Sequence, residues 1–125
     1  MKKRVLVVDD SEAIVEVVKM TLEMAGYEVA TSLTGECFRQ MENDLPDLIM
    51  LDVLLSGEDG RAICERLKGD EKTRDIPVIL LSAHAGLRKA IDECGANDFL
   101  AKPFRITDLR NIVKKYLSLS STMLL

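Results

Sequence analysis

The sequence predicts an α/β fold in which one doubly wound, five-stranded parallel sheet, of strand order 2-1-3-4-5, is flanked by five helices. Continuous apolar runs at residues 5–8, 48–51 and 78–81 are typical of strands that are covered on both faces. Segments with a helical period lie between these runs, and such alternation forms right-handed crossovers. A length of 125 residues corresponds to a single domain.

The first half of the chain follows this alternation. After the first strand, apolar residues recur at helical spacing, with Ser11 as the expected N-cap and Gly26 just past the end of the helix. Residues 28–31 fit the second strand, and a shorter helix is expected after Thr34. The apolar residues of the first predicted helix are Ile14, Val17, Val18, Leu22 and Ala25.

The second half repeats the pattern. Helices are expected after Gly60 and around residues 87–93, and residues 98–101 fit the fifth strand. We expect the folded domain to comprise residues 1–117, with residues 118–125 as a C-terminal tail or the start of a linker. The last predicted helix has an apolar stripe of Leu109, Ile112, Val113, Tyr116 and Leu117.

Composition narrows the function classes. Seventeen Lys and Arg residues against 21 Asp and Glu residues give a net charge of −4, so direct nucleic-acid binding is not expected. The apolar runs are all shorter than the roughly 18 residues that cross a bilayer, so membrane insertion is not expected. Three widely separated cysteines fit neither a disulfide framework nor a zinc site, and we expect a cytoplasmic protein.

Five polar residues are expected to meet at one edge of the sheet. Function in an open parallel sheet gathers beyond the carboxyl ends of the strands, where the strand order reverses. Asp9 and Asp10 follow the first apolar run, and Asp52 follows the third strand. The fourth strand ends in Ser82, and the fifth is followed by Lys102. With the first and third strands as neighbours, the three carboxylates converge.

This cluster predicts a chemistry of divalent cations and phosphoryl groups. Two ionised carboxylates roughly 6 Å apart repel by about 3 kcal/mol at an intermediate dielectric, which Lys102 and a cation would relieve. Oxygen ligands with room for water favour Mg²⁺. A carboxylate is also a nucleophile toward phosphoryl groups, whose transfer requires in-line positioning and charge neutralisation. The cation, Lys102 and the Ser82 hydroxyl are each expected to contact a phosphoryl oxygen.

Motifs at the strand ends resemble those of the receiver (response-regulator) domain of two-component signalling. They are Asp9-Asp10, Asp52 followed by Gly57-Glu58-Asp59-Gly60, Ser82-Ala83, and Phe99-Leu100-Ala101-Lys102-Pro103-Phe104. The resemblance extends over the chain up to Leu117, with every element in the expected order. It implies the flavodoxin-like receiver fold of chemotaxis-regulator-like proteins, and a phosphorylation-operated signalling switch in a phosphorelay.

The resemblance implies a role for each residue of the site. Asp52 accepts a phosphoryl group from a phosphohistidine. Asp10 and Asp52, with the backbone carbonyl of Leu54, ligate Mg²⁺ or Mn²⁺, while Asp9 acts directly or through water. Lys102 pairs with the acyl phosphate. The domain is therefore expected to catalyse its own phosphotransfer and dephosphorylation rather than to be a conventional enzyme.

The resemblance also implies a switch and its partners. Ser82 moves toward the phosphoryl group and Phe99, the switch aromatic, changes rotamer, which remodels the face of the fourth helix, fifth strand and fifth helix. The trigger is an added charge of about −1.5 to −2. The peptide bond between Lys102 and Pro103 is cis in this family. The implied partners are a sensor histidine kinase or phosphotransfer protein, and a downstream protein target or fused output domain.

Three positions bear on the lifetime of the phosphoryl group. Ser56 stands where the family often has Pro, so the loop after Asp52 is expected to be less rigid. Leu54 and His84 lie two residues after Asp52 and Ser82, at positions that flank the path of the hydrolytic water in the family. An apolar Leu54 is expected to exclude that water and to slow self-dephosphorylation.

Three other functions remain open at this point. A receiver-like interaction module that works without phosphorylation is opposed by the intact acidic cluster. A Mg²⁺-dependent phosphohydrolase of the haloacid-dehalogenase type needs a second acid two residues after the nucleophile, where this chain has Leu54. A flavodoxin-type electron-transfer protein holds a phosphate in its first loop, which Asp9 and Asp10 would repel.

Overall fold

The computed structural model of the chain describes residues 2–39, 41, 44–83 and 87–117. Five parallel strands form one sheet in the order β2-β1-β3-β6-β7, and β4 and β5 form a separate small hairpin. Within the sheet, β6 and β7 are the fourth and fifth strands along the chain, so the predicted order 2-1-3-4-5 is confirmed. The strands of the sheet are β1 (Arg4–Val8), β2 (Glu28–Ser32), β3 (Leu48–Asp52), β6 (Val78–Ser82) and β7 (Asp98–Ala101). The hairpin consists of β4 (Leu54–Leu55) and β5 (Glu58–Asp59).

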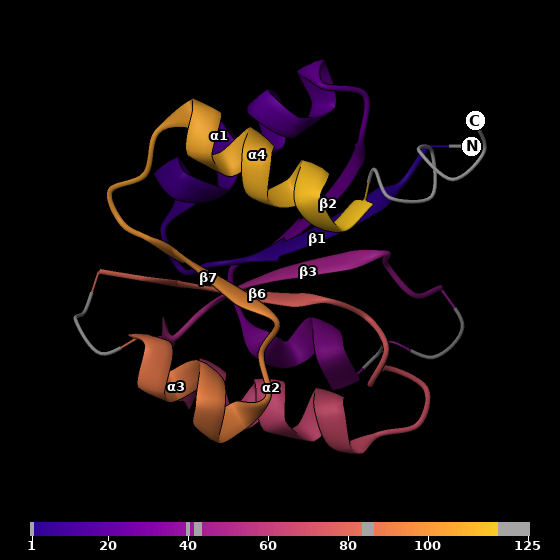
Figure 1. The fold of residues 1–125 in the computed structure, drawn as a ribbon, viewed down its shortest axis with the longest axis vertical. Coiled ribbons are helices and arrows are strands. Elements are labelled where there is room, and N and C mark those ends of the chain that lie inside the picture. The colour runs from indigo at the N-terminus through magenta and orange to yellow at the C-terminus, as the bar shows by residue number, and fades with distance from the viewer. Residues whose placement is uncertain (1, 40, 42–43, 84–86, 118–125) are drawn as a thin grey trace.

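Helices cover both faces of the sheet. α1 (Glu12–Met24) and α4 (Ile106–Leu117) lie on one face, and α2 (Gly60–Gly69) and α3 (Leu87–Cys94) lie on the other (Figure 1). The apolar core is divided accordingly into two clusters, one on each face. β3 and β6 are buried along their whole length, as their continuous apolar runs predict. In the part of the chain that the structure describes, no helix has both the length and the apolar character needed to span a membrane.

The first helix begins and ends as predicted but buries a partly different face. Ser11 caps α1 through its side chain, and Gly26 follows the helix with a φ of 99°. The side chain of Val17, which was expected in the apolar stripe, is 46% exposed. Residues three and four apart define the face that meets the sheet. The buried residues are Val15, Val18, Thr21 and Leu22.

The described residues contain four α-helices rather than the predicted five. The segment after Thr34 forms a short 3₁₀ helix, η1 (Gly35–Arg39), instead of an α-helix. Gly35, the first residue of this segment, has a low helix propensity. A Cβ at Gly35 would lie 2.7 Å from a carboxylate oxygen of Glu58 and 2.9 Å from the Cδ1 of Ile63, so a larger residue there would require these side chains to shift.

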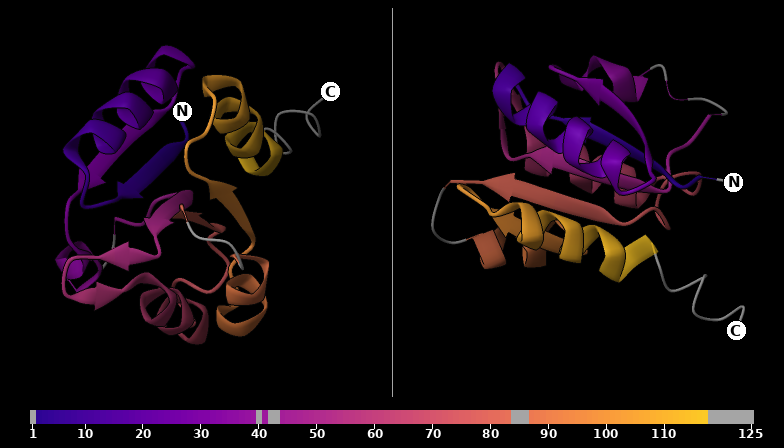
Figure 2. Two further views of the ribbon diagram at one scale, coloured as in Figure 1. Left: turned by 90° about the vertical axis from the view of Figure 1, so that its left-hand side faces the viewer. Right: turned by 90° about the horizontal axis from the view of Figure 1, so that it is seen from above.

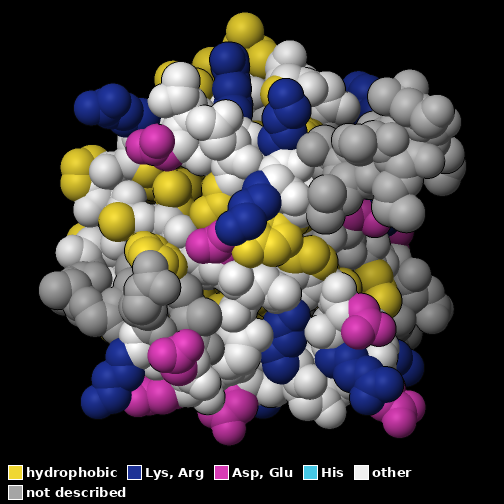
Figure 3. All heavy atoms as spheres, in the orientation of Figure 1, with side chains coloured by type: hydrophobic (Ala, Val, Ile, Leu, Met, Phe, Trp, Pro, Cys, Tyr) yellow, Lys and Arg dark blue, Asp and Glu magenta, His cyan; other side chains and the backbone are white. Residues whose placement is uncertain are grey.

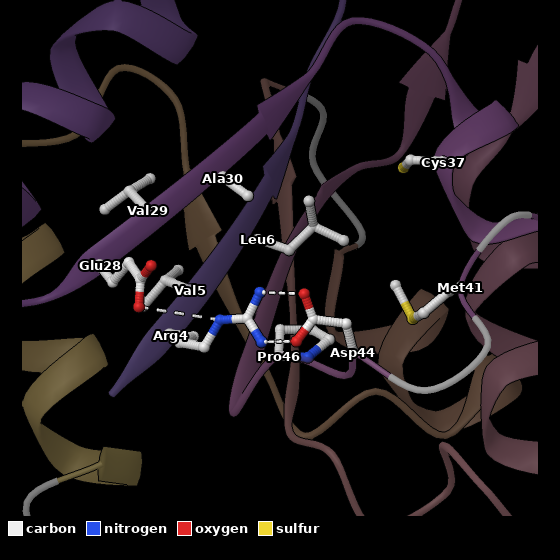
Figure 4. A pocket seen from close by; sticks show the side chains of 10 residues that line it. All are labelled: Arg4, Val5, Leu6, Glu28, Val29, Ala30, Cys37, Met41, Asp44 and Pro46. Atoms are coloured by element: carbon white, nitrogen blue, oxygen red, sulfur yellow. Dashed lines mark hydrogen bonds and ion pairs between the residues drawn. The ribbon is translucent and has the colours of Figure 1, made fainter. Parts of the chain in front are cut away.

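The β1–β2 half of the sheet adjoins a cavity of about 240 Å³ (Figure 4). Leu6 and Ala30 line it from the two neighbouring strands, and Cys37 and Met41 line it from the opposite side. The guanidinium group of Arg4 pairs with a carboxylate at one end of the cavity. Ala30 is exposed, so the short η1 does not cover this part of the sheet as the adjacent helices cover β3 and β6.

The two ends of the parallel strands lie at opposite rims of the sheet, and different parts of the chain gather at each. Register pairs Val8 with Leu51 and Asp52 with Leu81, so the residues that follow β1 and β3 meet at the same rim. β1 begins and α4 ends at the opposite rim (Figure 2). The polar residues singled out in the sequence therefore gather at one rim of the molecule, away from the start of β1.

Candidate functional site

Three carboxylates meet at the carboxyl ends of β1 and β3. Asp9 and Asp10 follow β1, and Asp52 is the last residue of β3. One carboxylate oxygen from each lies within 4.8 Å of the others. Asp9 and Asp52 are buried whereas Asp10 is exposed, so the cluster is open to solvent on one side. The convergence expected from the strand order is therefore present.

Lys102 joins the cluster from the end of β7. Its ammonium group lies 2.6 Å from Asp9 Oδ2 and 3.5 Å from Asp52 Oδ1. The Lys102–Pro103 peptide bond is cis, as the resemblance implied. The backbone N–H of Lys102 donates to the carbonyl of Ser82 at 2.9 Å, which ties the ends of β6 and β7 together. Four of the five predicted polar residues are thus linked around one point.

The surroundings of Asp9 and Asp52 fit a cation. Asp9 Oδ2 is buried and has no hydrogen-bond partner of good geometry among the described residues, so the Lys102 ion pair balances its charge. Burial and then the charge of Asp9 raise the pKa of Asp52, although Lys102 opposes them. A hard divalent cation among these oxygens would favour the ionised carboxylates and use the lone pairs of Asp9 Oδ2.

The remaining predicted residues lie around this cluster or outside the described part of the chain. Ser82 ends β6 and is 3% exposed. Leu54 donates its backbone N–H to Asp52 Oδ1 at 3.3 Å, and its side chain is 52% exposed beside the site. Phe99, on β7, is half-buried and packs against the core cluster below the sheet. His84 lies outside the described residues.

Sequence reasoning singled out Ser56 and Gly60 in the loop after β3 but missed the contacts that these two residues make. The hydroxyl of Ser56 donates to Asp10 Oδ2 at 3.0 Å. Gly60 begins α2 so close to β3 that a Cβ there would lie 2.0 Å from the carbonyl oxygen of Asp52. Asp59, the N-cap of α2, marked the place where a helix starts, but not how near that helix start lies to the site.

The face formed by α3, β7 and α4 carries apolar side chains that gather over β7 (Figure 3). Polar contacts tie β7 to α4 beside them, because Tyr116 donates to Asp98 at 2.8 Å and Lys115 pairs with the same carboxylate at 3.1 Å. Burial and the Asp98 carboxylate raise the pKa of Tyr116 to about 12, so the phenol remains a donor at neutral pH.

Comparison with known families agrees with this geometry. The model of the response regulator receiver domain matches residues 5–114, which is most of the chain. The chain belongs to this family. Receiver domains are the phosphorylation-operated switches of two-component signal transduction, and they bind Mg²⁺ at an acidic pocket such as the one formed by the three aspartates.

Individual relatives support the same assignment. The DNA-binding dual master transcriptional regulator RpaA of Synechocystis is 42% identical over 109 residues, which cover 85% of this chain and 45% of RpaA. The signal receiver domain of a signal transduction histidine kinase from Syntrophus aciditrophicus superposes with a TM-score of 0.84 at 39% identity, covering 93% of this chain and 90% of that one. The chain thus spans less than half the length of RpaA.

A further solved relative has a magnesium ion coordinated in its active-site cleft. It is the receiver domain of the sensor histidine kinase PA1611 from Pseudomonas aeruginosa. The TM-score is 0.83 at 29% identity, with 93% of this chain and 98% of that chain covered. The ion of that relative gives a specific reason to consider the aspartate cluster of this chain as a magnesium site.

Proposed function

We propose that Asp52 is the phosphoacceptor of this receiver domain. The observation that supports this most directly is that Lys102 lies within 4 Å of both Asp9 and Asp52 at the end of the sheet. In the proposed site Asp9, Asp10, Asp52 and the backbone carbonyl of Leu54 hold Mg²⁺, and Mn²⁺ is a substitute with the same oxygen preference. The ion supplies positive charge to the phosphoryl oxygens when it is bound.

The chemistry assigned to the side chains is phosphoryl transfer from a phosphohistidine. A carboxylate oxygen of Asp52 forms a new bond to phosphorus while the bond from phosphorus to the histidine nitrogen breaks, and the freed imidazole takes up a proton. The ammonium of Lys102 offsets the charge on the phosphoryl oxygens, and the Ser82 hydroxyl donates to one of them. Burial of Asp52 limits the access of competing water to this site.

The output of this transfer is proposed to be a change at the α3–β7–α4 face. The phosphoryl group adds a charge of about −1.5 to −2 at the carboxyl end of β3. Ser82, on the neighbouring strand, moves toward that charge, and half-buried Phe99 changes rotamer to fill the space released. The apolar surface over β7 is then presented differently to a partner.

The expected test result is a phosphorylated protein only when Asp52 is intact. After incubation with Mg²⁺ and acetyl phosphate, intact-mass measurement should show one added phosphoryl group, which chelation of the metal prevents. The Asp52→Asn variant should gain none. Asp59→Asn is the matched control, because Asp59 caps α2 at the same rim and asparagine also caps helices.

An alternative outcome would overturn the assignment. An adduct that persists in Asp52→Asn would move the acceptor to another side chain. Absence of any adduct in the unmodified chain, with the metal present, would favour a receiver-like module that works through protein contacts alone. Peptide mapping would identify the side chain that carries an adduct in Asp52→Asn, and the intact mass alone shows when no adduct forms.

The partners and the setting are also proposals. A sensor histidine kinase or a phosphotransfer protein is the proposed phosphoryl donor, and a downstream protein or a fused output domain is the proposed recipient of the signal. The receiver unit is proposed to comprise residues 1–117, and residues 118–125 lie outside the described residues. Three free cysteines, of which Cys64 and Cys94 are buried, support a reducing cytoplasm.

Replacing Leu54 with asparagine is expected to shorten the life of the acyl phosphate roughly tenfold, equivalent to about 1.4 kcal/mol of barrier. The exposed Leu54 side chain lies two residues after Asp52 and keeps water from the phosphoryl group, whereas an amide would bind and orient that water. Loss of the added mass after removal of acetyl phosphate measures the rate. Leu54→Met is the apolar control, and equal or slower decay in Leu54→Asn would contradict this role. His84 is proposed to flank the same path.

A further inference from the structure

The side chain of Ser56 connects two loops of the site. Its hydroxyl donates to Asp10 Oδ2 at 3.0 Å, across a separation of 46 residues in the chain. Ser56 lies at the turn of the β4–β5 hairpin, and Asp10 lies between β1 and α1. We propose that Ser56 is a positioning residue that orients the Asp10 carboxylate for Mg²⁺. This inference rests on the magnesium site described under the proposed function.

The hairpin holds Ser56 in a defined place. Leu55 pairs with Glu58, and the side chain of Leu55 is buried against the core below the sheet. Gly57 has a φ of 77°, a conformation that glycine adopts without strain and that closes the turn. The N–H of Leu54 bonds to the Asp52 carboxylate at the start of the same hairpin. Ser56 is thereby fixed relative to the phosphoacceptor.

Asp10 is the member of the cluster for which such a contact is most useful. Asp9 is buried and held by Lys102 and by the N–H of Ser11, which donates to Asp9 Oδ1 at 2.9 Å. The Asp10 carboxylate is exposed, and repulsion from its two acidic neighbours favours rotation toward solvent. A hydrogen bond from Ser56 to one oxygen opposes that rotation and leaves the second oxygen available to a cation.

A donor behind a ligand carboxylate is a recognised means of tuning metal affinity. Partners of this kind fix the orientation of the ligand, and their loss weakens binding of the metal about tenfold or more. Ser56 is exposed, so the lower end of that range is expected here. The same hydrogen bond couples the β4–β5 hairpin to the β1–α1 loop, because Asp10 belongs to that loop and Ser56 to the hairpin.

The test compares Mg²⁺ titrations of the unmodified chain with those of Ser56→Ala and Ser56→Thr. Backbone amide resonances around Asp10 and Leu54 report the dissociation constant without any phosphorylation. Ser56→Ala is expected to raise the dissociation constant for Mg²⁺ about tenfold with an unchanged Tm. Ser56→Thr keeps the hydroxyl and is expected to have the dissociation constant of the unmodified chain. Thr31→Val removes an exposed hydroxyl from β2 and is the matched control.

The outcomes separate this inference from the proposed function. If the unmodified chain does not bind Mg²⁺, the proposed metal site itself is wrong. If that chain binds Mg²⁺ and Ser56→Ala binds equally well or more tightly, the positioning role is overturned while the metal site stands. A Ser56→Thr protein that binds Mg²⁺ as weakly as Ser56→Ala would also overturn the positioning role, because the effect would then not come from the hydroxyl.

Discussion

The Gly60→Ala substitution is expected to lower the free energy of unfolding by about 3 kcal/mol or more and to reduce phosphorylation severely. The added Cβ would lie 2.0 Å from the carbonyl oxygen of Asp52 and 3.0 Å from the Cα of Val53. Both are backbone atoms, so no rotation of a side chain relieves the clash. The N–H of Gly60 also donates to the carbonyl of Val53 at 2.8 Å, which prevents α2 from simply moving away.

Gly69 provides the matched control within the same helix. A Cβ at Gly69 meets nothing within 4 Å, so Gly69→Ala is expected to be neutral or to stabilise by about 0.5–1 kcal/mol. Urea denaturation gives the free energy of unfolding for both variants, and intact mass after acetyl phosphate treatment gives their phosphorylation. A Gly60→Ala protein with normal stability would mean that α2 does not start as close to β3 as the structure places it.

Lys102→Met is expected to destabilise the protein by about 3 kcal/mol in the absence of divalent cations. Asp9 is fully buried, and its Oδ2 atom relies on the ammonium group 2.6 Å away. Methionine keeps most of the apolar stem but leaves the carboxylate charge without its partner. Removal of one member of a buried pair costs far more than the pair itself contributes, because the other charge remains desolvated.

Added Mg²⁺ should restore part of that stability. A cation that binds only the folded state stabilises it by mass action, and in the variant it also replaces the missing positive charge. Tm measured with and without Mg²⁺ should therefore rise more in Lys102→Met than in the unmodified protein. Lys115→Met is the control, because Lys115 pairs with Asp98 at the surface and such pairs contribute at most about 1 kcal/mol. An equal response to Mg²⁺ in all three proteins would contradict this account.

Much of the fold was predictable because its signals are local. The apolar runs that became β1, β3 and β6 are continuous, and both of their faces are buried. The two elements that were predicted wrongly, η1 and the buried face of α1, have local sequence patterns that fit more than one structure. Period alone does not distinguish a short α-helix from the 3₁₀ turn of η1, nor does it decide whether Val17 or Val15 faces the sheet.

The site was predictable to the extent that topology determines it. Parallel strands bring Asp9, Asp52 and Lys102 to one rim whatever the details of the loops. The contact between Ser56 and Asp10 was not predictable in this way, since it depends on the geometry of the short β4–β5 hairpin, whose sequence is typical of a loop. The closeness of Gly60 to Asp52 likewise appears only when α2 is docked on the sheet.

The position of the end of α4 has a consequence for any longer polypeptide built on this domain. α4 ends at the rim opposite the aspartate cluster, where β1 also begins (Figure 1). The polypeptide that follows Leu117 therefore leaves the described domain at the rim away from the phosphoryl group. A fluorescent label attached at that rim should leave the chemistry at the aspartate cluster undisturbed.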